Sequence, residues 1–312
     1  MIAGFLLSAY SIVANDALQT LGTFLSANED KPWWLLWSYA GFILTTIFIA
    51  GWFFNGGDPA YGRLTIIPVP YVFTPLYLVP PIAILILTNF GIPVSTTFLV
   101  LTIFAPQALD DMVIKSLFGY GLAFSVSLIV YRLIIAKVEG WFIADKDKEI
   151  SPLWVVLQWV STGFLWSQWL IQDFANIFAY LPRQLSLQWL LFALGVMLLL
   201  HAIIFINRGG EIGKIITSKT NTQDIRSATF INVIYGSILL FFAQYSQVPM
   251  STTWVFLGLL AGREISISWN GQGQTMRETL TLIGKDGAKA LLGLVISVIL
   301  AYGLPWLIGQ NL

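Results

Sequence analysis

The sequence contains no cysteine and only one histidine among its 312 residues. Without thiols it can form no disulfide framework, no thiolate metal site and no thiol-based active site. Charge is also scarce, because 10% of the residues are Asp, Glu, Lys or Arg, against about 25% in a typical soluble domain. The 16 basic and 16 acidic residues cancel, and they form no basic stripe that would bind nucleic acid. These absences disfavour hydrolytic enzymes, metalloenzymes and nucleic-acid-binding proteins.

Apolar side chains, in contrast, make up 57% of the sequence. Apolar runs of about 20 residues recur along the chain, and a helix needs this length to cross a bilayer. The first run has no basic segment before it and no small-residue cleavage site, so we expect a retained membrane span rather than a signal peptide. The composition therefore predicts an all-α integral membrane protein whose principal partner is the lipid bilayer.

We expect about ten membrane-spanning segments, some of them too short to cross completely. They cover residues 2–26, 33–54, 69–90, 94–105 and 113–135 in the first half, and 153–181, 187–206, 228–245, 250–262 and 290–308 in the second. Pro75, Pro80 and Pro81 in the third segment predict a kink or a break. The charged stretch 137–152 is expected to link a first repeat (1–136) to a second (153–312), and residues 263–289 are expected to form a polar loop.

The basic residues fall almost entirely on one side of this predicted topology. Arg63, Lys115 and Arg183 are the only Lys or Arg expected on the other side. Because cytoplasmic loops carry an excess of Lys and Arg, we expect a multi-pass cell-membrane protein with a cytoplasmic central linker and both termini outside. Arg63, Arg183, Arg263 and Glu264 fall at predicted segment ends, where an interfacial position is expected.

Two polar motifs recur in the same order in each half. The first consists of an amide, a carboxylate, two apolar residues and a second amide, at residues 15–19 (Asn-Asp-Ala-Leu-Gln) and 172–176 (Gln-Asp-Phe-Ala-Asn). The second is Pro-x-Ser-Thr-Thr, at residues 93–97 and 249–253. Nearly the same number of residues separates the two motifs in both halves, which indicates an internal duplication. Since each half has an odd number of predicted spans, we expect two inverted five-span repeats with short or re-entrant helices, an arrangement typical of secondary transporters.

Asp16 and Asp173 are expected deep in apolar segments, where an ionised carboxylate costs roughly 2.5–3.5 kcal/mol. A bound cation or a proton would remove this cost, and a hydrogen bond that joins two helices is the structural alternative. The two amides of each motif are four residues apart, so they share a helix face. Such a face can hold a hard cation through oxygen atoms, donate hydrogen bonds to an anion, or join two membrane helices.

Each Ser-Thr-Thr motif follows a proline and begins a short apolar segment. Ser95 and Ser251 are suitable helix N-caps, and a preceding proline prevents the helix from extending backwards. A half-helix that begins at mid-depth presents free backbone N–H groups and the positive end of its dipole, which suits an anion. The threonine hydroxyls add further donors, although Ser and Thr in membrane helices commonly bond back to their own helix. Gly119 and Gly121 predict close helix packing.

The order and spacing of these motifs resemble the inorganic phosphate transporter (PiT) family, and the resemblance covers most of the chain. That family carries a Gly-Ala-Asn-Asp-Val-Ala-Asn type motif in each inverted half and, later, a Pro-Ile-Ser-Thr-Thr-His type motif. This chain departs from the pattern at Gln19 and Gln172, each one methylene longer than the family's Asn. Phe98 and Trp254 stand where the family has histidine. The resemblance is therefore to a divergent member.

The resemblance implies a secondary active transporter of a small inorganic oxyanion, phosphate first and sulfate next. Transport would be coupled to sodium or proton symport by alternating access, with a sodium ion and no covalent cofactor. The implied sodium ligands are Asn15, Asp16, Asp173 and Asn176. The residues implied for the anion are Ser95, Thr96, Thr97, Ser251, Thr252, Thr253, Gln19 and Gln172.

Other functions stay open from the sequence alone. A cation transporter or channel would use Asp16 and Asp173 as ligands and would carry cations without any anion. A sensor or structural protein could keep the transporter fold and lack transport, since a fold does not fix a function. A membrane-embedded enzyme is disfavoured because few residues are available for catalysis. The identity of the anion, the coupling ion and the oligomeric state, including a homodimer, also stay open.

Overall fold

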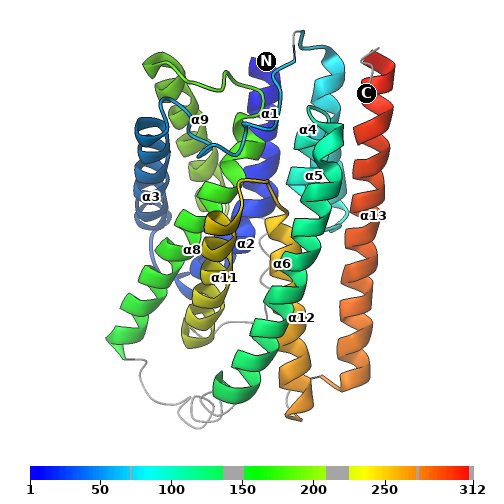
Figure 1. Cartoon of the computed structure of the whole chain (residues 1–312). Coiled ribbons are helices and arrows are strands. Elements are labelled where there is room, and N and C mark those ends of the chain that lie inside the picture. Colours follow the sequence, from blue (N-terminus) through cyan, green and yellow to red (C-terminus); the bar gives the residue numbers. More distant parts are fainter. Residues whose placement is uncertain (71, 136–150, 209–224, 272–273, 309–312) are drawn as a thin grey trace.

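The computed structural model describes residues 1–70, 72–135, 151–208, 225–271 and 274–308. Within these ranges the regular structure is helical and contains no strand, as the composition predicts. Five of the described helices are long and apolar enough to cross a membrane, and two shorter apolar helices accompany them. The N-terminus and the end of the last helix lie at one end of the bundle, and the helices before and after the predicted linker have their adjoining ends at the other (Figure 1).

The first half contains several short helical elements besides two long helices. In chain order these elements are α1 (Ile2–Ile12), η1 (Val13–Ala17), α2 (Leu18–Ala27), α3 (Trp33–Phe54), η2 (Pro75–Leu78), α4 (Val79–Asn89), α5 (Thr96–Leu101), η3 (Pro106–Ala108), α6 (Leu109–Val130) and η4 (Tyr131–Ile135). The predicted third span at 69–90 is too long, because the helical structure begins only at Pro75. Pro80 and Pro81 lie in the first turn of α4, where a missing N–H breaks no helical hydrogen bond.

The second half is built from longer helices. They are α8 (Pro152–Phe178), α9 (Leu187–Ile206), α11 (Ile225–Tyr245), α12 (Thr252–Trp269) and α13 (Met276–Ile308). The predicted polar loop at 263–289 is wrong, since α12 continues through Arg263 and α13 already starts at Met276. Thr275 and Glu278 exchange hydrogen bonds between side chain and backbone N–H, which is a capping box that starts α13.

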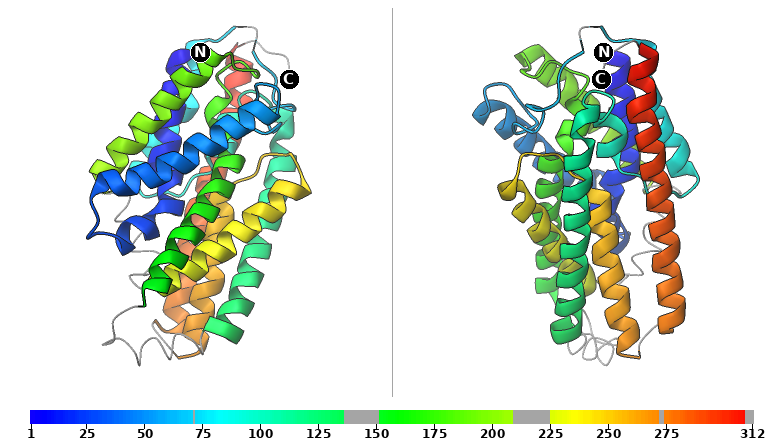
Figure 2. Two further views of the ribbon diagram at one scale, coloured as in Figure 1. Left: turned by 90° about the vertical axis from the view of Figure 1, so that its left-hand side faces the viewer. Right: turned by 45° about the vertical axis from the view of Figure 1, so that its right-hand side comes forward.

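Two helical hairpins enter the bundle from opposite ends. The α4–α5 hairpin enters from the end that holds the termini, and the α11–α12 hairpin enters from the other end (Figures 1 and 2). Their tips meet, because the Thr97 hydroxyl donates to the Met250 carbonyl at 2.9 Å and the Thr253 hydroxyl donates to the Val94 carbonyl at 3.2 Å. The expected short or re-entrant helices are therefore present, although α12 is longer than predicted.

The remaining helices pack around these hairpins. α8 contacts α1, α2, α3, α5, α11 and α12 and so forms the centre of the bundle. α3 and α9 lie together on one flank, and α13 lies on the other (Figure 2). α12 lies directly on α6, because a methyl group at Gly258 or Gly262 would overlap the backbone carbonyls of Tyr120 and Phe124. Of the two glycines expected at close contacts, Gly119 faces Val255 and Met250, whereas the space at Gly121 is open.

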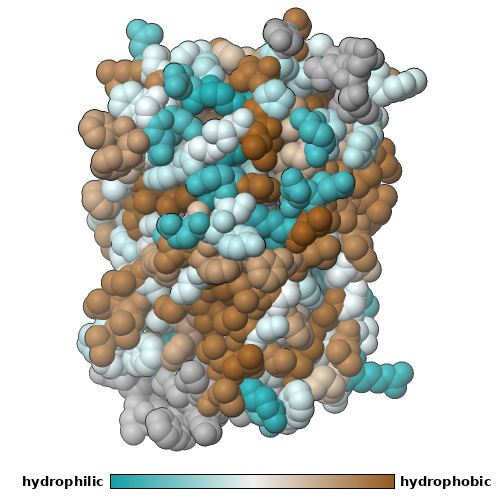
Figure 3. Space-filling model, in the orientation of Figure 1, coloured by the Kyte–Doolittle hydropathy of each residue, from teal (hydrophilic) through white to brown (hydrophobic). Residues whose placement is uncertain are grey.

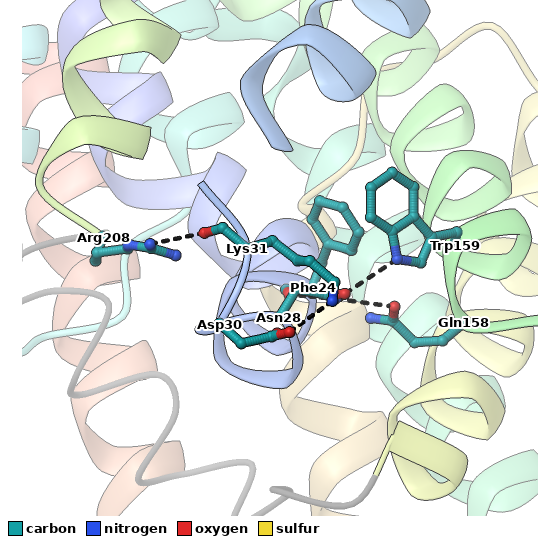
Figure 4. A network of polar contacts seen from close by, with 7 residues as sticks. All are labelled: Phe24, Asn28, Asp30, Lys31, Gln158, Trp159 and Arg208. Carbon is teal, nitrogen blue, oxygen red and sulfur yellow. Dashed lines mark hydrogen bonds and ion pairs between the residues drawn. The ribbon is translucent and has the colours of Figure 1, made fainter. Parts of the chain in front are cut away.

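A polar network fastens the end of α2 to α8. The Asn28 amide donates to the Phe24 carbonyl at 2.9 Å and to Gln158 Oε1 at 3.2 Å, and its oxygen accepts from the Trp159 indole at 3.0 Å (Figure 4). The α2 C-terminus is thus held by side chains, which satisfy groups that a helix end leaves without partners. On the outer surface, hydrophilic side chains gather over the upper half of the face in Figure 3, and apolar side chains dominate below them.

Candidate functional site

The two motif carboxylates lie where the hairpin tips meet. Asp16 is in the π-helical turn η1, and Asp173 is near the end of α8; both side chains are completely buried. The two carboxylates are close enough to repel each other electrostatically. Short π-helical turns interrupt α-helices most often at functional sites, so the break between α1 and α2 fits a binding role for Asp16.

Both oxygens of Asp16 are hydrogen-bonded. Oδ1 accepts from Asn15 Nδ2 at 2.7 Å, from Gln19 Nε2 at 3.0 Å and from the Thr253 hydroxyl at 3.3 Å. Oδ2 accepts from the Thr96 hydroxyl at 2.6 Å. These donors come from both halves of the chain, so the carboxylate joins η1 to the start of α5 and to the start of α12.

Asp173 has a much poorer set of donors. Its Oδ1 accepts from Asn176 Nδ2 at 2.6 Å, but its Oδ2 is buried without a hydrogen-bond partner among the described residues. In the described part of the chain, Asn176 Oδ1 and Thr252 Oγ1 are also buried without a partner in good hydrogen-bond geometry, although the Thr252 hydroxyl lies close enough to act on the Asp173 carboxylate. An unpaired buried polar group costs about 1–3 kcal/mol. Because these atoms are all oxygens and one is a carboxylate, the set fits a hard monovalent cation such as sodium.

The same hydrogen bonds occur twice with the halves exchanged. Gln19 Nε2 donates to Asp16 and to the Thr253 hydroxyl, at 3.0 Å and 3.3 Å. Asn176 Nδ2 donates to Asp173 and to the Thr97 hydroxyl, at 2.6 Å and 3.2 Å. The second amide of each motif therefore bridges its own carboxylate to the second threonine of the other half. Asn176 also donates to Thr96, at 3.2 Å.

Ser95 and Ser251 cap the helices that follow them. Ser95 Oγ accepts from the backbone N–H of Phe98 at 3.1 Å, and Ser251 Oγ accepts from that of Trp254 at 3.2 Å. This agrees with the predicted N-caps. Since a hydroxyl that accepts still has its hydrogen, each serine retains one donor. α5 is six residues long, so its dipole is weaker than that of an extended helix.

Gln172 is set apart from the other predicted site residues. Its Nε2 donates to the Leu239 carbonyl of α11 at 3.0 Å, and its buried Oε1 has no partner among the residues that the structure describes. No hydrogen bond connects its side chain to Asp173 or to the described threonines. The structure thus joins eleven of the twelve predicted positions through shared hydrogen bonds, helix starts or direct proximity, and Gln172 faces a different helix.

Two buried cations lie near this cluster, and no binding role is predicted for either from the sequence. Arg63, expected at the interface, is 1% exposed, donates from Nε to the Ile171 carbonyl at 2.9 Å, and acts electrostatically on Asp173. Lys115 on α6 donates to the carbonyls of Ser246 at 2.8 Å and Val248 at 2.5 Å, in the turn between α11 and α12. A lysine in an apolar span is a signal of function, whereas nothing in the sequence near Arg63 indicates its burial.

Other features of the described residues do not form part of this site. A cavity of about 810 Å³ lies between α6, α12 and α13, but neither aspartate lines it. The described residues contain no cluster of His, Cys, Asp and Glu that would hold a metal through three such side chains. The buried carboxylate pair and the threonines at the hairpin tips are therefore the best candidate for a binding site.

Comparison with known proteins supports the fold. No protein-family model matches the sequence, and no curated protein matches it. A solved structure described as "The sodium-dependent phosphate transporter" matches over 100% of this chain and 98% of its own, with a TM-score of 0.60 and 15% sequence identity. At that identity the likeness shows a shared fold alone. It confirms the membrane-transporter fold that the motif resemblance implies.

Proposed function

Starting from this transporter fold, we propose that the chain is a secondary transporter of a small inorganic oxyanion, phosphate first and sulfate next. The coupling ion is sodium, with a proton as the alternative. The observation that carries the proposal is the buried pair Asp16 and Asp173 at the meeting point of two hairpin tips, with unpaired oxygens around Asp173. The solved structure that shares this fold is, by its printed description, a sodium-dependent phosphate transporter.

The two halves act as inverted repeats, each with a helical hairpin that provides two of its five segments. Support comes from the exchanged hydrogen bonds, in which Gln19 reaches Thr253 and Asn176 reaches Thr97. Further support comes from the hairpins, which enter from opposite ends (Figure 2). The repeats cover residues 1–136 and 153–312; much of the linker at 137–152 lies outside the described residues. In inverted-repeat transporters the substrate site lies at the repeat interface, where both aspartates are found here.

Sodium binds among the side-chain oxygens of Asp173 and Asn176, together with the Thr252 hydroxyl. A cation there supplies the positive charge that balances the Asp173 carboxylate. Asn15 and Asp16 offer a second position, although hydrogen bonds already occupy both oxygens of Asp16. A cation at that second position would therefore have to displace donors, so the first ion binds on the Asp173 side.

The anion is held by threonine hydroxyls that donate to acceptors of the protein in this conformation. Thr96 and Thr253 donate to Asp16, and Thr97 donates to a backbone carbonyl. When cations neutralise the carboxylates, these hydroxyls become free to donate to an oxyanion. Thr252, Ser95 and Ser251 complete the donor set, and Gln19 adjusts its shape, whereas Gln172 donates to the Leu239 carbonyl and lies outside it. This competition for the same hydroxyls gives a physical reason for coupling.

The α4–α5 hairpin gates access from the end that holds the termini, and the α11–α12 hairpin gates access from the opposite end. The excess of Lys and Arg on the linker side supports a cytoplasmic location for that side. Each hairpin would move relative to the fixed helices as the site alternates between the two faces of the membrane.

The test is uptake of labelled phosphate and sulfate into proteoliposomes, with and without an inward sodium gradient. Asp16→Asn and Asp173→Asn each replace one carboxylate, and Asp30→Asn is the control, because Asp30 is exposed and pairs with Lys31 rather than with a site residue. We expect sodium-dependent uptake of one anion in the wild type and the control, and a loss of at least about tenfold in each site variant, since charge-assisted bonds are removed. Full coupled uptake in both site variants would overturn the proposal.

A second function, cation transport without an anion, is favoured by the unpaired oxygens at Asp173 and Asn176. The same proteoliposomes distinguish it. Sodium flux that is independent of phosphate and sulfate, and that is lost in Asp173→Asn, would support cation transport and exclude oxyanion symport.

A further inference from the structure

Arg63 is a buried cation whose hydrogen-bonding capacity is not fully used. Its side chain is 1% exposed, Nε donates to the Ile171 carbonyl at 2.9 Å, and Nη1 has no partner among the described residues. Arg183, in the loop between α8 and α9, shows the opposite pattern. All three of its guanidinium nitrogens donate to backbone carbonyls, at 3.0–3.2 Å. Arg183 therefore has a structural role, whereas Arg63 has donor capacity left over.

The segment before Arg63 fixes its position. The Asp58 carboxylate accepts from the backbone N–H groups of Ala60 at 2.7 Å and Gly62 at 2.8 Å. Tyr61 has a left-handed backbone with φ of 55°, and its hydroxyl donates to the Ile47 carbonyl of α3 at 2.7 Å. A non-glycine residue in that region costs about 1–2 kcal/mol, so the surrounding contacts must hold it. The result is a turn that directs Arg63 into the bundle.

The charge of Arg63 acts on Asp173, the site carboxylate with fewer hydrogen-bond donors. The Ile171 carbonyl that accepts from Arg63 Nε lies two residues before Asp173 in α8, which places the guanidinium within electrostatic range of Asp173, whose Oδ2 is buried without a hydrogen bond from the described residues. Asp173 is also repelled by Asp16. A buried charge without compensation is strongly destabilising, and Arg63 supplies a positive charge from within the protein. Lys115 is not among the described groups that act on Asp173, and its ammonium donates to two carbonyls of the α11–α12 turn.

We propose that Arg63 is a switching counter-charge that balances Asp173 before sodium binds and then donates from its free guanidinium nitrogen to the transported oxyanion. The inference rests on the proposed function and adds a residue that determines anion specificity. A guanidinium suits this role because its planar, fixed donors match two oxygens of a tetrahedral oxyanion. Sodium and Arg63 then compete for Asp173, so the cation binds first and the anion follows.

The test uses purified full-length protein and three variants. Arg63→Gln removes the charge and retains a hydrogen-bond donor, Arg63→Lys keeps the charge without the planar fork, and Arg183→Lys is the matched control. Sodium is titrated without any anion, and phosphate is titrated in saturating sodium, both followed by thermal unfolding. An opposite charge near a carboxylate changes the equilibrium by which the carboxylate binds a proton by about tenfold or more, and we expect a similar effect on sodium binding.

We expect Arg63→Gln to bind sodium about tenfold more tightly and phosphate about tenfold more weakly, because a competing cation and an anion donor are both lost. Arg63→Lys should keep the sodium affinity and weaken phosphate binding, and Arg183→Lys should change neither. A purely structural role for Arg63 would lower both affinities together, and that result would overturn the inference.

The outcomes also separate this inference from the proposed function. Wild-type protein that binds neither phosphate nor sulfate in sodium would overturn the proposed function together with the anion role of Arg63. Wild-type binding that persists unchanged in Arg63→Gln would overturn the inference alone. If Arg63→Gln does not fold, Arg63→Lys decides, because unchanged phosphate affinity in that variant contradicts a role for the guanidinium.

Discussion

Replacing Asn176 with alanine removes the amide hydrogen bond to Asp173 Oδ1. The Asn176 amide donates to Asp173 Oδ1 at 2.6 Å and to the hydroxyls of Thr96 and Thr97 at 3.2 Å each. A bond to a charged group contributes about 1.5–3 kcal/mol, and a polar contact within a membrane averages about 0.6 kcal/mol. The summed loss in the free energy of unfolding is about 3 kcal/mol. A candidate sodium ligand is lost with the amide.

Gln19→Ala is the matched control, because Gln19 occupies the equivalent position in the first motif. Its amide donates to Asp16 at 3.0 Å and to Thr253 at 3.3 Å. Asp16 keeps three other donors after this change, from Asn15, Thr96 and Thr253. The expected loss in the free energy of unfolding is therefore only about 1 kcal/mol.

Sodium titration followed by thermal unfolding measures both variants. We expect Asn176→Ala to lower the free energy of unfolding by about 3 kcal/mol and Gln19→Ala by about 1 kcal/mol, and we expect sodium to stabilise Asn176→Ala less than the wild type because a proposed ligand oxygen is lost with the amide. The two positions look alike in the sequence, so the difference depends wholly on the donors that each carboxylate retains. Equal losses in the two variants, or a larger loss in Gln19→Ala, would refute this reasoning.

Two further predictions concern the α11–α12 hairpin. Gly262→Ala would place a methyl group against the backbone of Phe124 and separate α12 from α6, so we expect a loss of about 1–3 kcal/mol in stability and a lower melting temperature. Gly121→Ala faces open space and should leave the melting temperature unchanged. Lys115→Met releases the two carbonyls of the α11–α12 turn, so sodium-driven uptake should fall while the melting temperature changes less than in Gly262→Ala. Unchanged uptake in Lys115→Met would contradict a role for this lysine in holding the hairpin tip.

Hydropathy predicts the long membrane helices well, because uninterrupted apolar runs leave few alternatives. The predicted spans at 33–54 and 187–206 coincide with α3 and α9. Hydropathy fails for the first turns of α13, because their polar residues predict a loop. The capping box formed by Thr275 and Glu278 is visible in the sequence as Thr-x-x-Glu. Local capping chemistry, rather than hydropathy, marks that boundary.

The burial of Arg63 has no comparable sequence signal. It lies in a segment rich in Gly and Pro, between α3 and η2, where no periodic pattern shows which side chains point inward. Its position depends on the Asp58 turn and on the contact of Tyr61 with α3, which are tertiary features. The motif aspartates were predictable because an acid in an apolar run requires an explanation, whereas an arginine in a loop does not.

The matched motifs suggest two equivalent carboxylates, but their surroundings differ, and this difference gives the proposed cycle a direction. Asp16 lies in a π-helical turn and has four side-chain donors, whereas Asp173 lies in a continuous helix with one amide donor and the charge of Arg63. A cation therefore gains most at Asp173, where it replaces Arg63. In the proposed cycle the released guanidinium and the threonine hydroxyls both donate to the oxyanion, which balances the charge that the cation introduced. Coupling follows because neither ion is well compensated in the absence of the other.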